Sequence, residues 1–291
     1  MNTSPDSNAD NGSSADLSNP AEPAPLSSYT PYVPPPSDAP AKQIVKLRLQ
    51  DPFHWLGLGW RDLLAAKGIS IFYGVCFWLM ALLLAAVFRN QPEYAMSITS
   101  GCLLLGPFLA VGLYEVSRRR EQGLVPDLGS SLTCWKSHLR SMGMLVLVLI
   151  VLELLWGRAS LVVFAVFFNT GMPSTTGVIE AIFNPENREF LAVYLLVGGV
   201  FAGLVFAMSV VSIPMILDRD TDAISAAITS LQVVGGNTVV MLLWGVLLTS
   251  LVSVALTPWG LGLVLIGPLL GHASWHAYRG SVRWLEEAPT S

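Results

Sequence analysis

The chain has 291 residues, of which 53% are hydrophobic and only 12% are charged, and its mean hydropathy is +0.57. Soluble domains carry roughly a quarter charged residues, and few of the charges here interrupt the long apolar runs. The composition excludes an ordinary water-soluble domain and indicates helices embedded in a lipid bilayer.

Residues 1–41 differ in composition from the rest of the chain. They are rich in Ser, Pro, Ala, Asp and Asn, and the first basic residue is Lys42. Such a segment has too little apolar surface to offset the conformational entropy lost on folding. We therefore expect residues 1–41 to form a disordered cytoplasmic tail, followed by a membrane domain at 42–283 and a short C-terminal tail at 284–291.

Six apolar segments follow, and each is long enough to cross a membrane. About 20 apolar residues at a rise of 1.5 Å each cross a hydrocarbon core ~30 Å thick. The sequence predicts an all-α membrane protein with six transmembrane helices. The expected spans are about 69–88, 98–116, 142–168, 190–217, 238–256 and 259–278.

The basic residues predict the orientation of these spans. Of the 16 Lys and Arg residues, 13 lie before span one, between spans two and three, after span four or after span six. Only Arg89 and Arg188 fall on the other side, and Arg158 lies within span three. Because cytoplasmic loops are enriched in Lys and Arg, we place both chain ends in the cytoplasm.

A weak internal repeat precedes the odd-numbered spans. Each of these cytoplasmic segments has apolar side chains at helical spacing, and each even-numbered span contains a proline. The apolar positions are Phe53, Trp60 and Leu64, then Leu128, Trp135 and Leu139, then Ile224, Ile228 and Leu231. We expect three repeats of a cytoplasmic interfacial helix followed by a transmembrane hairpin.

The expected interfacial helices carry residues that suit a membrane surface. Trp60 and Trp135 fit the headgroup boundary, and Arg61 and Lys136 fit anionic lipid. The simple interpretation is contact with membrane lipids. Binding of a specific lipid or of a partner protein is the alternative.

Four stretches resemble one bacterial family. They are LGWRDLLAAKGISIFYG from Leu58, LLLGPFLAVGLYEVSRR ending at Arg119, SIPMILDRDTDAISAAITS from Ser212, and GPLLGHASWHAYR ending at Arg279. They are similar to the predicted integral membrane proteins grouped as domain of unknown function 2189, and the resemblance as a whole covers about residues 50–283. The resemblance implies a bacterial inner-membrane location and no established activity.

Some members of that family are labelled as like cytochrome c oxidase subunit I, and the histidines here argue against such chemistry. The label implies a bundle of about a dozen spans in which histidines on different helices hold haems and copper. This chain has four histidines. His54 and His138 lie in cytoplasmic segments, while His272 and His276 share one helix. We predict no cofactor.

His272 and His276 are nevertheless a possible metal site. At a spacing of i, i+4 they face the same way near the cytoplasmic end of span six, as in helix-borne zinc sites. No nearby Glu within the helix completes a set like that of the zinc proteases. The alternative is a polar cap in which both imidazoles hydrogen-bond to neighbouring helices.

Glu153 and Arg158 are possible members of a polar site within the membrane. A charge at the centre of a span costs roughly 2.5–3.5 kcal/mol on insertion scales, so such residues normally find partners. Five positions separate them by about 140° around the helix, so we expect each to reach another span. They either line a path for a proton, ion or small polar solute, or act as a structural clamp.

The sequence lacks the motifs of several enzyme classes. It has no phosphate-binding loop, no zinc-protease motif, no nucleophile elbow and no dinucleotide fingerprint. The basic run Arg118–Arg120 is explained by topology rather than by nucleic acid. We predict a non-enzymatic accessory or structural partner of a membrane complex, in contact with lipids and other membrane proteins. The alternatives are a transporter or channel using span three, and a metal- or haem-handling protein.

The orientation is testable with reporter fusions. A fluorescent protein fused after Ser291 is expected to fluoresce, and alkaline phosphatase fused at the same place is expected to be inactive, because both would lie in the cytoplasm. Active phosphatase together with a dark fluorescent fusion would reverse the orientation.

Overall fold

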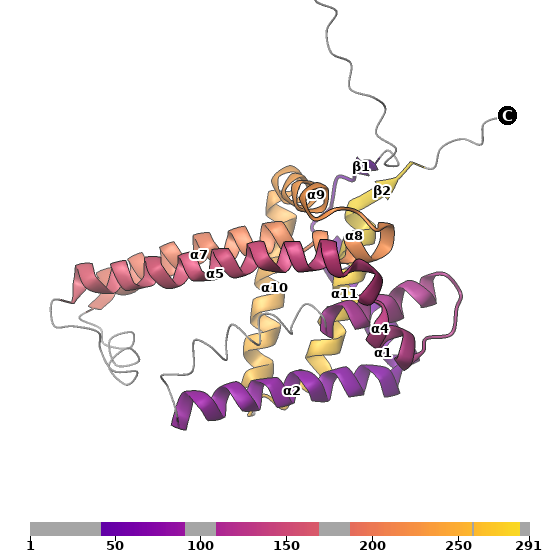
Figure 1. The fold of residues 1–291 in the computed structure, drawn as a ribbon, viewed down its shortest axis with the longest axis horizontal. Coiled ribbons are helices and arrows are strands. Elements are labelled where there is room, and N and C mark those ends of the chain that lie inside the picture. The colour runs from indigo at the N-terminus through magenta and orange to yellow at the C-terminus, as the bar shows by residue number, and fades with distance from the viewer. Residues whose placement is uncertain (1–41, 91–108, 169–186, 258, 286–291) are drawn as a thin grey trace, which may run out of the picture. The chain divides into compact units, whose positions relative to one another are not determined.

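The computed structural model describes residues 42–90, 109–168, 187–257 and 259–285. These residues are helical apart from one pair of short strands and the connections (Figure 1). A further helical segment at 109–121 belongs to predicted span two. The elements are β1 (Lys42–Ile44), α1 (Asp51–Ala65), α2 (Lys67–Asn90), α4 (Leu128–Thr133), the 3-10 turn η3 (Lys136–His138), α5 (Leu139–Phe167), α7 (Arg188–Ser209), α8 (Ser212–Arg219), α9 (Ala223–Gly236), α10 (Thr238–Leu256), α11 (Leu263–Ser281) and β2 (Val282–Trp284).

Four stretches in the described part of the chain are long and apolar enough to cross a membrane. They are Lys67–Val87, Leu128–Phe167, Arg188–Arg219 and Thr238–Leu256, and they correspond to predicted spans one, three, four and five. The first part of span two and the tail at 1–41 lie outside the described residues. Span six corresponds to α11, which is less apolar than these four. The fold is therefore helical with several apolar helices, and the count of six spans stays a prediction.

Helix α11 is the most buried of the long helices. Ten of its 19 residues are buried, whereas α5 buries four of 29. Helices α1, α2 and α10 contact it. Two glycines allow close approach to the α11 backbone: a Cβ at Gly59 of α1 would lie 2.7 Å from the Ala273 nitrogen, and one at Gly74 of α2 would lie 2.0 Å from the Val264 oxygen. Protein rather than lipid therefore surrounds much of α11.

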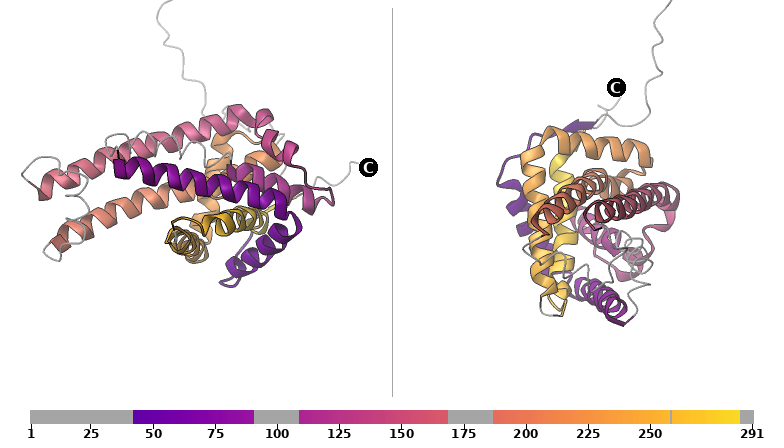
Figure 2. Two further views of the ribbon diagram at one scale, coloured as in Figure 1. Left: turned by 90° about the horizontal axis from the view of Figure 1, so that it is seen from below. Right: turned by 90° about the vertical axis from the view of Figure 1, so that its left-hand side faces the viewer.

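Helices α5 and α7 form an antiparallel pair (Figure 1, Figure 2). At one end of the pair, Val163 and Phe190 belong to a small aromatic cluster separate from the main core. Near the other end, Met142, Leu145 and Val146 are buried. The stretch of α5 between these ends contains no buried residue.

Predicted span four is divided into α7 and α8. The division falls at Val210 and Val211, just before Pro214. A proline clashes with the carbonyl four residues earlier and lacks an N–H of its own, so a break is expected there. The Val211 N–H instead donates to the Ser230 hydroxyl of α9 at 3.2 Å.

Three helices begin where the sequence predicted interfacial helices. Pro52 lies in the first turn of α1, Asp127 caps α4 by accepting from the Ser130 N–H at 2.8 Å, and Asp222 caps α9 in the same way. The expectation of one helix before span three is wrong in detail, because α4 ends at Thr133 and a 3-10 turn follows. The threefold repeat remains a prediction.

The strand pair was not expected from the sequence. Lys42 is paired with Trp284 and Ile44 with Val282 in an antiparallel arrangement. Strands of three residues are too short for an alternating pattern to be recognised. The pairing brings the beginning and the end of the predicted membrane domain together.

The close contact between α1 and α11 predicts opposite effects for two substitutions in one helix. Gly59→Ala places a methyl against the α11 backbone and is expected to destabilise the fold by about 1–3 kcal/mol. Gly57→Ala meets nothing within 4 Å, so it is expected to stabilise α1 by up to about 1 kcal/mol. Thermal unfolding of the detergent-solubilised variants measures both effects. An unfolding temperature of Gly59→Ala equal to that of wild type would contradict the close contact between α1 and α11.

Candidate functional site: a polar network around helix α11

A fully buried histidine lies at the centre of the candidate site. The His272 ring of α11 has its Nε2 3.0 Å from the Ser70 hydroxyl of α2 and its Nδ1 2.8 Å from the Ser117 hydroxyl. Each serine donates or accepts according to the imidazole tautomer. Both ring nitrogens are thus engaged within the protein, and the ring joins three helical segments.

One turn further along α11, His276 contacts the buried carboxylate of Asp62. The His276 Nε2 lies 2.8 Å from one Asp62 oxygen, and Arg120 forms an ion pair with the other. Asp62 belongs to α1 and is only 6% exposed. Ser117 also favours the ionised form of Asp62, so it lies near both this carboxylate and His272. We call Asp62, Ser70, Ser117, Arg120, His272 and His276 the histidine network.

The surroundings of Asp62 favour its ionised form. Burial alone would raise the pKa of this carboxyl. Hydrogen bonds from His276 and Ser117, and the nearby charges of His276 and His272, outweigh that effect and hold the pKa below its usual value. Asp62 is therefore a buried anion with a cation and two polar partners.

A second group of contacts surrounds Glu121, which we call the Glu121 cluster. One Glu121 oxygen accepts from Arg279 Nε at 2.9 Å, and the other accepts from the Trp275 indole at 3.0 Å. The Tyr278 hydroxyl donates to Asp218 of α8 at 2.7 Å. These bonds link α11 to the helical segment 109–121 and to α8.

The Glu121 cluster borders a polar hollow of about 340 Å³. Two further arginines line it: Arg118, which pairs with Glu115 at 2.7 Å, and Arg219, which lies over the Trp284 ring. Arg219 also pairs with Asp218 at 3.5 Å, and Arg279 pairs with Glu121. Because each arginine at this hollow has a carboxylate partner, the hollow presents no unpaired positive charge for an anion.

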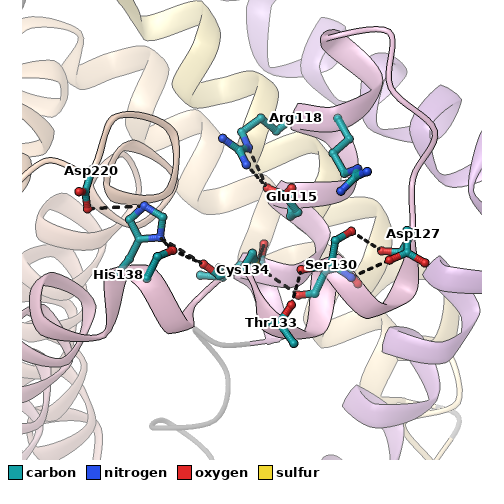
Figure 3. Close-up of polar contacts among 12 residues, drawn as sticks. Glu115, Arg118, Asp127, Ser130, Thr133, Cys134, His138 and Asp220 are labelled. Atoms are coloured by element: carbon teal, nitrogen blue, oxygen red, sulfur yellow. Dashed lines mark hydrogen bonds and ion pairs between the residues drawn. The ribbon is translucent and has the colours of Figure 1, made fainter.

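A third group of contacts anchors the segment before α5 (Figure 3). Asp127 caps α4, and His138 lies between the Cys134 carbonyl at 3.1 Å and Asp220 at 3.6 Å. Asp220 has a left-handed backbone with φ of 49° and ends α8. The η3 segment is thereby tied to the turn between α8 and α9.

The structure keeps the other predicted site residues apart from this network. Glu153 is half-buried and Arg158 is exposed on α5, and neither has a hydrogen bond or ion pair with any described residue. The two histidines, in contrast, both lie in the network. Among the residues that the structure describes, no group of three potential metal ligands occurs.

The predicted interfacial residues occupy outward-facing positions. Trp60 is 42% exposed, and Arg61 and Lys136 are exposed. Trp135 is half-buried and donates from its indole to the Leu132 carbonyl at 2.7 Å. The apolar faces noted in the sequence are also exposed on α1 and α9, at Phe53, Trp60 and Leu64, and at Ile224, Ile228 and Leu231.

Sequence reasoning missed the acidic members of the site. Asp62 had a usable signal, because it shares a helical face with Trp55 and Gly59 at i, i+4, i+7 spacing, and all three are buried. Arg120 was assigned to the topology-determining basic run. Its pairing with Asp62, 58 positions earlier, had no signal in the sequence.

Several apolar helices around buried polar contacts define an integral membrane protein. A family model described as predicted integral membrane protein (DUF2189) matches residues 95–218, and the resemblance is confirmed over that segment. The match includes α4 to α8, Ser117, Arg120 and Glu121. Asp62, His272 and His276 lie outside it. No curated protein and no solved structure matches the chain.

The shared carboxylate predicts a pH-dependent stability difference. Asp62→Asn removes the anion that Arg120 and His276 contact, and it is expected to lower the free energy of unfolding by about 2 kcal/mol at pH 7. This is less than the loss for a fully buried ion pair, because Arg120 is partly exposed. Since the folded pKa of Asp62 lies below its unfolded value, its stabilising contribution is present above about pH 4 and is lost as the pH falls further.

Thermal unfolding between pH 7 and pH 3 measures this difference. Asp220→Asn is the matched control, because the Asp220 side chain is 77% exposed and Asn tolerates a left-handed backbone. A gap between wild type and Asp62→Asn that stays constant down to pH 3 would contradict the assignment.

Proposed function

We propose that the protein is a non-enzymatic accessory or structural partner of a membrane complex and that it binds another membrane protein along the α5–α7 pair. One observation carries the proposal. Glu153 and Arg158 lie in the apolar stretch of α5, and neither pairs with a described residue. Intramembrane charges face partners or water by default, and a partner outside the chain meets that need.

The position of the two charges makes them costly when they are unpaired. Glu153 is the middle residue of α5, which runs from Leu139 to Phe167. Each charge at the centre of a span costs roughly 2.5–3.5 kcal/mol on insertion scales. An oppositely charged or hydrogen-bonding group on a neighbouring protein recovers much of that cost.

The surface around these charges is open for contact. No residue of α5 between positions 147 and 162 is buried. Gly199 and Gly203 of α7 meet nothing within 4 Å, so their flat backbone is uncovered. Small residues of this kind allow close approach between membrane helices.

The two alternative functions have less support. A solute or ion path along α5 calls for a hollow lined by Glu153 or Arg158, and the hollows described in this structure are lined by other residues. A metal- or haem-handling role calls for His272 and His276 to release hydrogen bonds to Ser70, Ser117 and Asp62.

The proposed location is the bacterial inner membrane, with both ends of the chain in the cytoplasm. The distribution of 13 basic residues supports this orientation. The pairing of β1 with β2 supports an even number of spans, because it requires residues 42–44 and 282–284 to lie on the same side.

The proposal predicts that removing the charge of Glu153 or Arg158 weakens binding of the partner protein and does not lower the stability of the fold. Cross-linking in native membranes followed by purification is expected to yield a stoichiometric partner with wild type, and at least about tenfold less with Glu153→Gln or Arg158→Gln. Glu189→Gln, at the exposed beginning of α7, is the control and is expected to behave as wild type.

The stability of the isolated variants separates the proposal from a structural clamp. Removing an unpaired charge is expected to leave the thermal unfolding temperature in detergent unchanged or raised. A lowered unfolding temperature would show that the charges pair within the chain. Unchanged capture of the partner by both variants would also contradict the proposal.

A further inference from the structure

Two hollows follow one side of helix α2 and share Ala81 as a lining residue. The outer hollow, of about 810 Å³, lies between the end of α2 and the connection from α10 to α11, and it includes Arg89 and Trp259. The inner one, of about 360 Å³, lies between α2 and α11 and includes Phe77 and Gly267. Together they form a groove along α2, which we call the α2 groove.

The mouth of the α2 groove carries a cation without an acidic partner. The Arg89 guanidinium lies 5.3 Å from the centre of the Trp259 ring. Among the residues that the structure describes, no carboxylate pairs with Arg89. Its charge is therefore available to an anion that lies over the groove.

The backbone holds Trp259 at this mouth. Trp259 and Gly260 both have left-handed backbones, with φ of 54° and 72°, and the Trp78 indole donates to the Trp259 carbonyl at 3.2 Å. The Trp259 side chain stays 74% exposed. A left-handed conformation is unusual for a tryptophan, and here it keeps the ring beside Arg89.

The inner part of the groove is mostly apolar and runs along α2 from Phe77 to Leu84. Ala81 of α2 is the small residue where the two hollows meet, and the side chains of Phe77 and Leu113 pack directly against Gly267 and Gly271 of α11. Its polar edge is formed by Tyr114 and Ser274, and the Ser274 hydroxyl donates to the Leu270 carbonyl at 2.7 Å. From Phe77 to Arg89 the helix rises by roughly 18 Å, close to the ~15 Å thickness of one hydrocarbon leaflet.

We propose that the α2 groove binds an anionic phospholipid, with its phosphate on Arg89, its glycerol beside Trp259 and one acyl chain along the groove. Arginine recognises phosphate, and tryptophan favours the membrane–water boundary. A headgroup with its own ammonium would find no carboxylate at this mouth among the described residues. The chemistry therefore favours a lipid without a cationic headgroup, such as phosphatidylglycerol.

Native mass spectrometry of the full-length protein in mild detergent tests this proposal. After incubation with equal amounts of phosphatidylglycerol and phosphatidylcholine, wild type is expected to retain one phosphatidylglycerol at least about tenfold more than phosphatidylcholine. Arg89→Gln is expected to remove that preference, and Ala81→Trp is expected to lower retention of phosphatidylglycerol by about tenfold or more.

Two control variants are matched to these changes. Arg89→Lys keeps the charge and is expected to retain the preference. Leu79→Trp adds the same large side chain to α2 at a position that is 54% exposed and outside the groove, so retention is expected to match wild type. The thermal unfolding temperature of each variant reports whether it is folded.

Three results would overturn the proposal. The first is equal retention of phosphatidylcholine and phosphatidylglycerol by wild type. The second is unchanged retention in Arg89→Gln and folded Ala81→Trp. The third is competition by glycerophosphoglycerol, the headgroup without acyl chains, at the same concentration as the lipid. If Ala81→Trp does not fold, Arg89→Gln and Arg89→Lys test the proposal by themselves: equal retention of phosphatidylglycerol by these two variants would contradict it.

Discussion

The buried carboxylate of Asp62 is the interaction on which the packing around α11 depends. It accepts from His276 and pairs with Arg120, and its ionised form is also favoured by Ser117, which hydrogen-bonds His272. A helix that carries two histidines and an arginine is costly to place in lipid. Its burial against α1 and α2 replaces lipid with hydrogen-bonding partners, and Gly59 permits the close approach that the short bonds require.

This constraint divides the helices into two groups, which differ in whether their charged side chains have partners within the described residues. Around α11, the charged groups described above have partners, including Glu121 with Arg279 and Asp218 with Tyr278. On α5, Glu153 and Arg158 have none among the described residues. The same energetic rule, that a charge in an apolar medium needs a partner, explains the paired charges of the first group and underlies the external partner proposed for the second.

The local features of the fold were largely predictable because they depend on neighbouring residues. The starts of α1, α4 and α9 follow from Pro52, Asp127 and Asp222, and the break before α8 follows from Pro214. The apolar faces of α1 and α9 were also visible in the spacing. The candidate site was predicted only at His272 and His276, since their helical spacing is a local property.

The sequence by itself determined a helical membrane protein, the approximate extent of its apolar helices and the family of residues 95–218, because hydropathy and short motifs are read along the chain. Only the tertiary structure decided which polar residues meet. Asp62 lies 214 positions from His276 and 58 from Arg120, and β1 pairs with β2 across nearly the whole membrane domain. Such contacts depend on how helices pack, and no periodicity in one segment encodes the position of another.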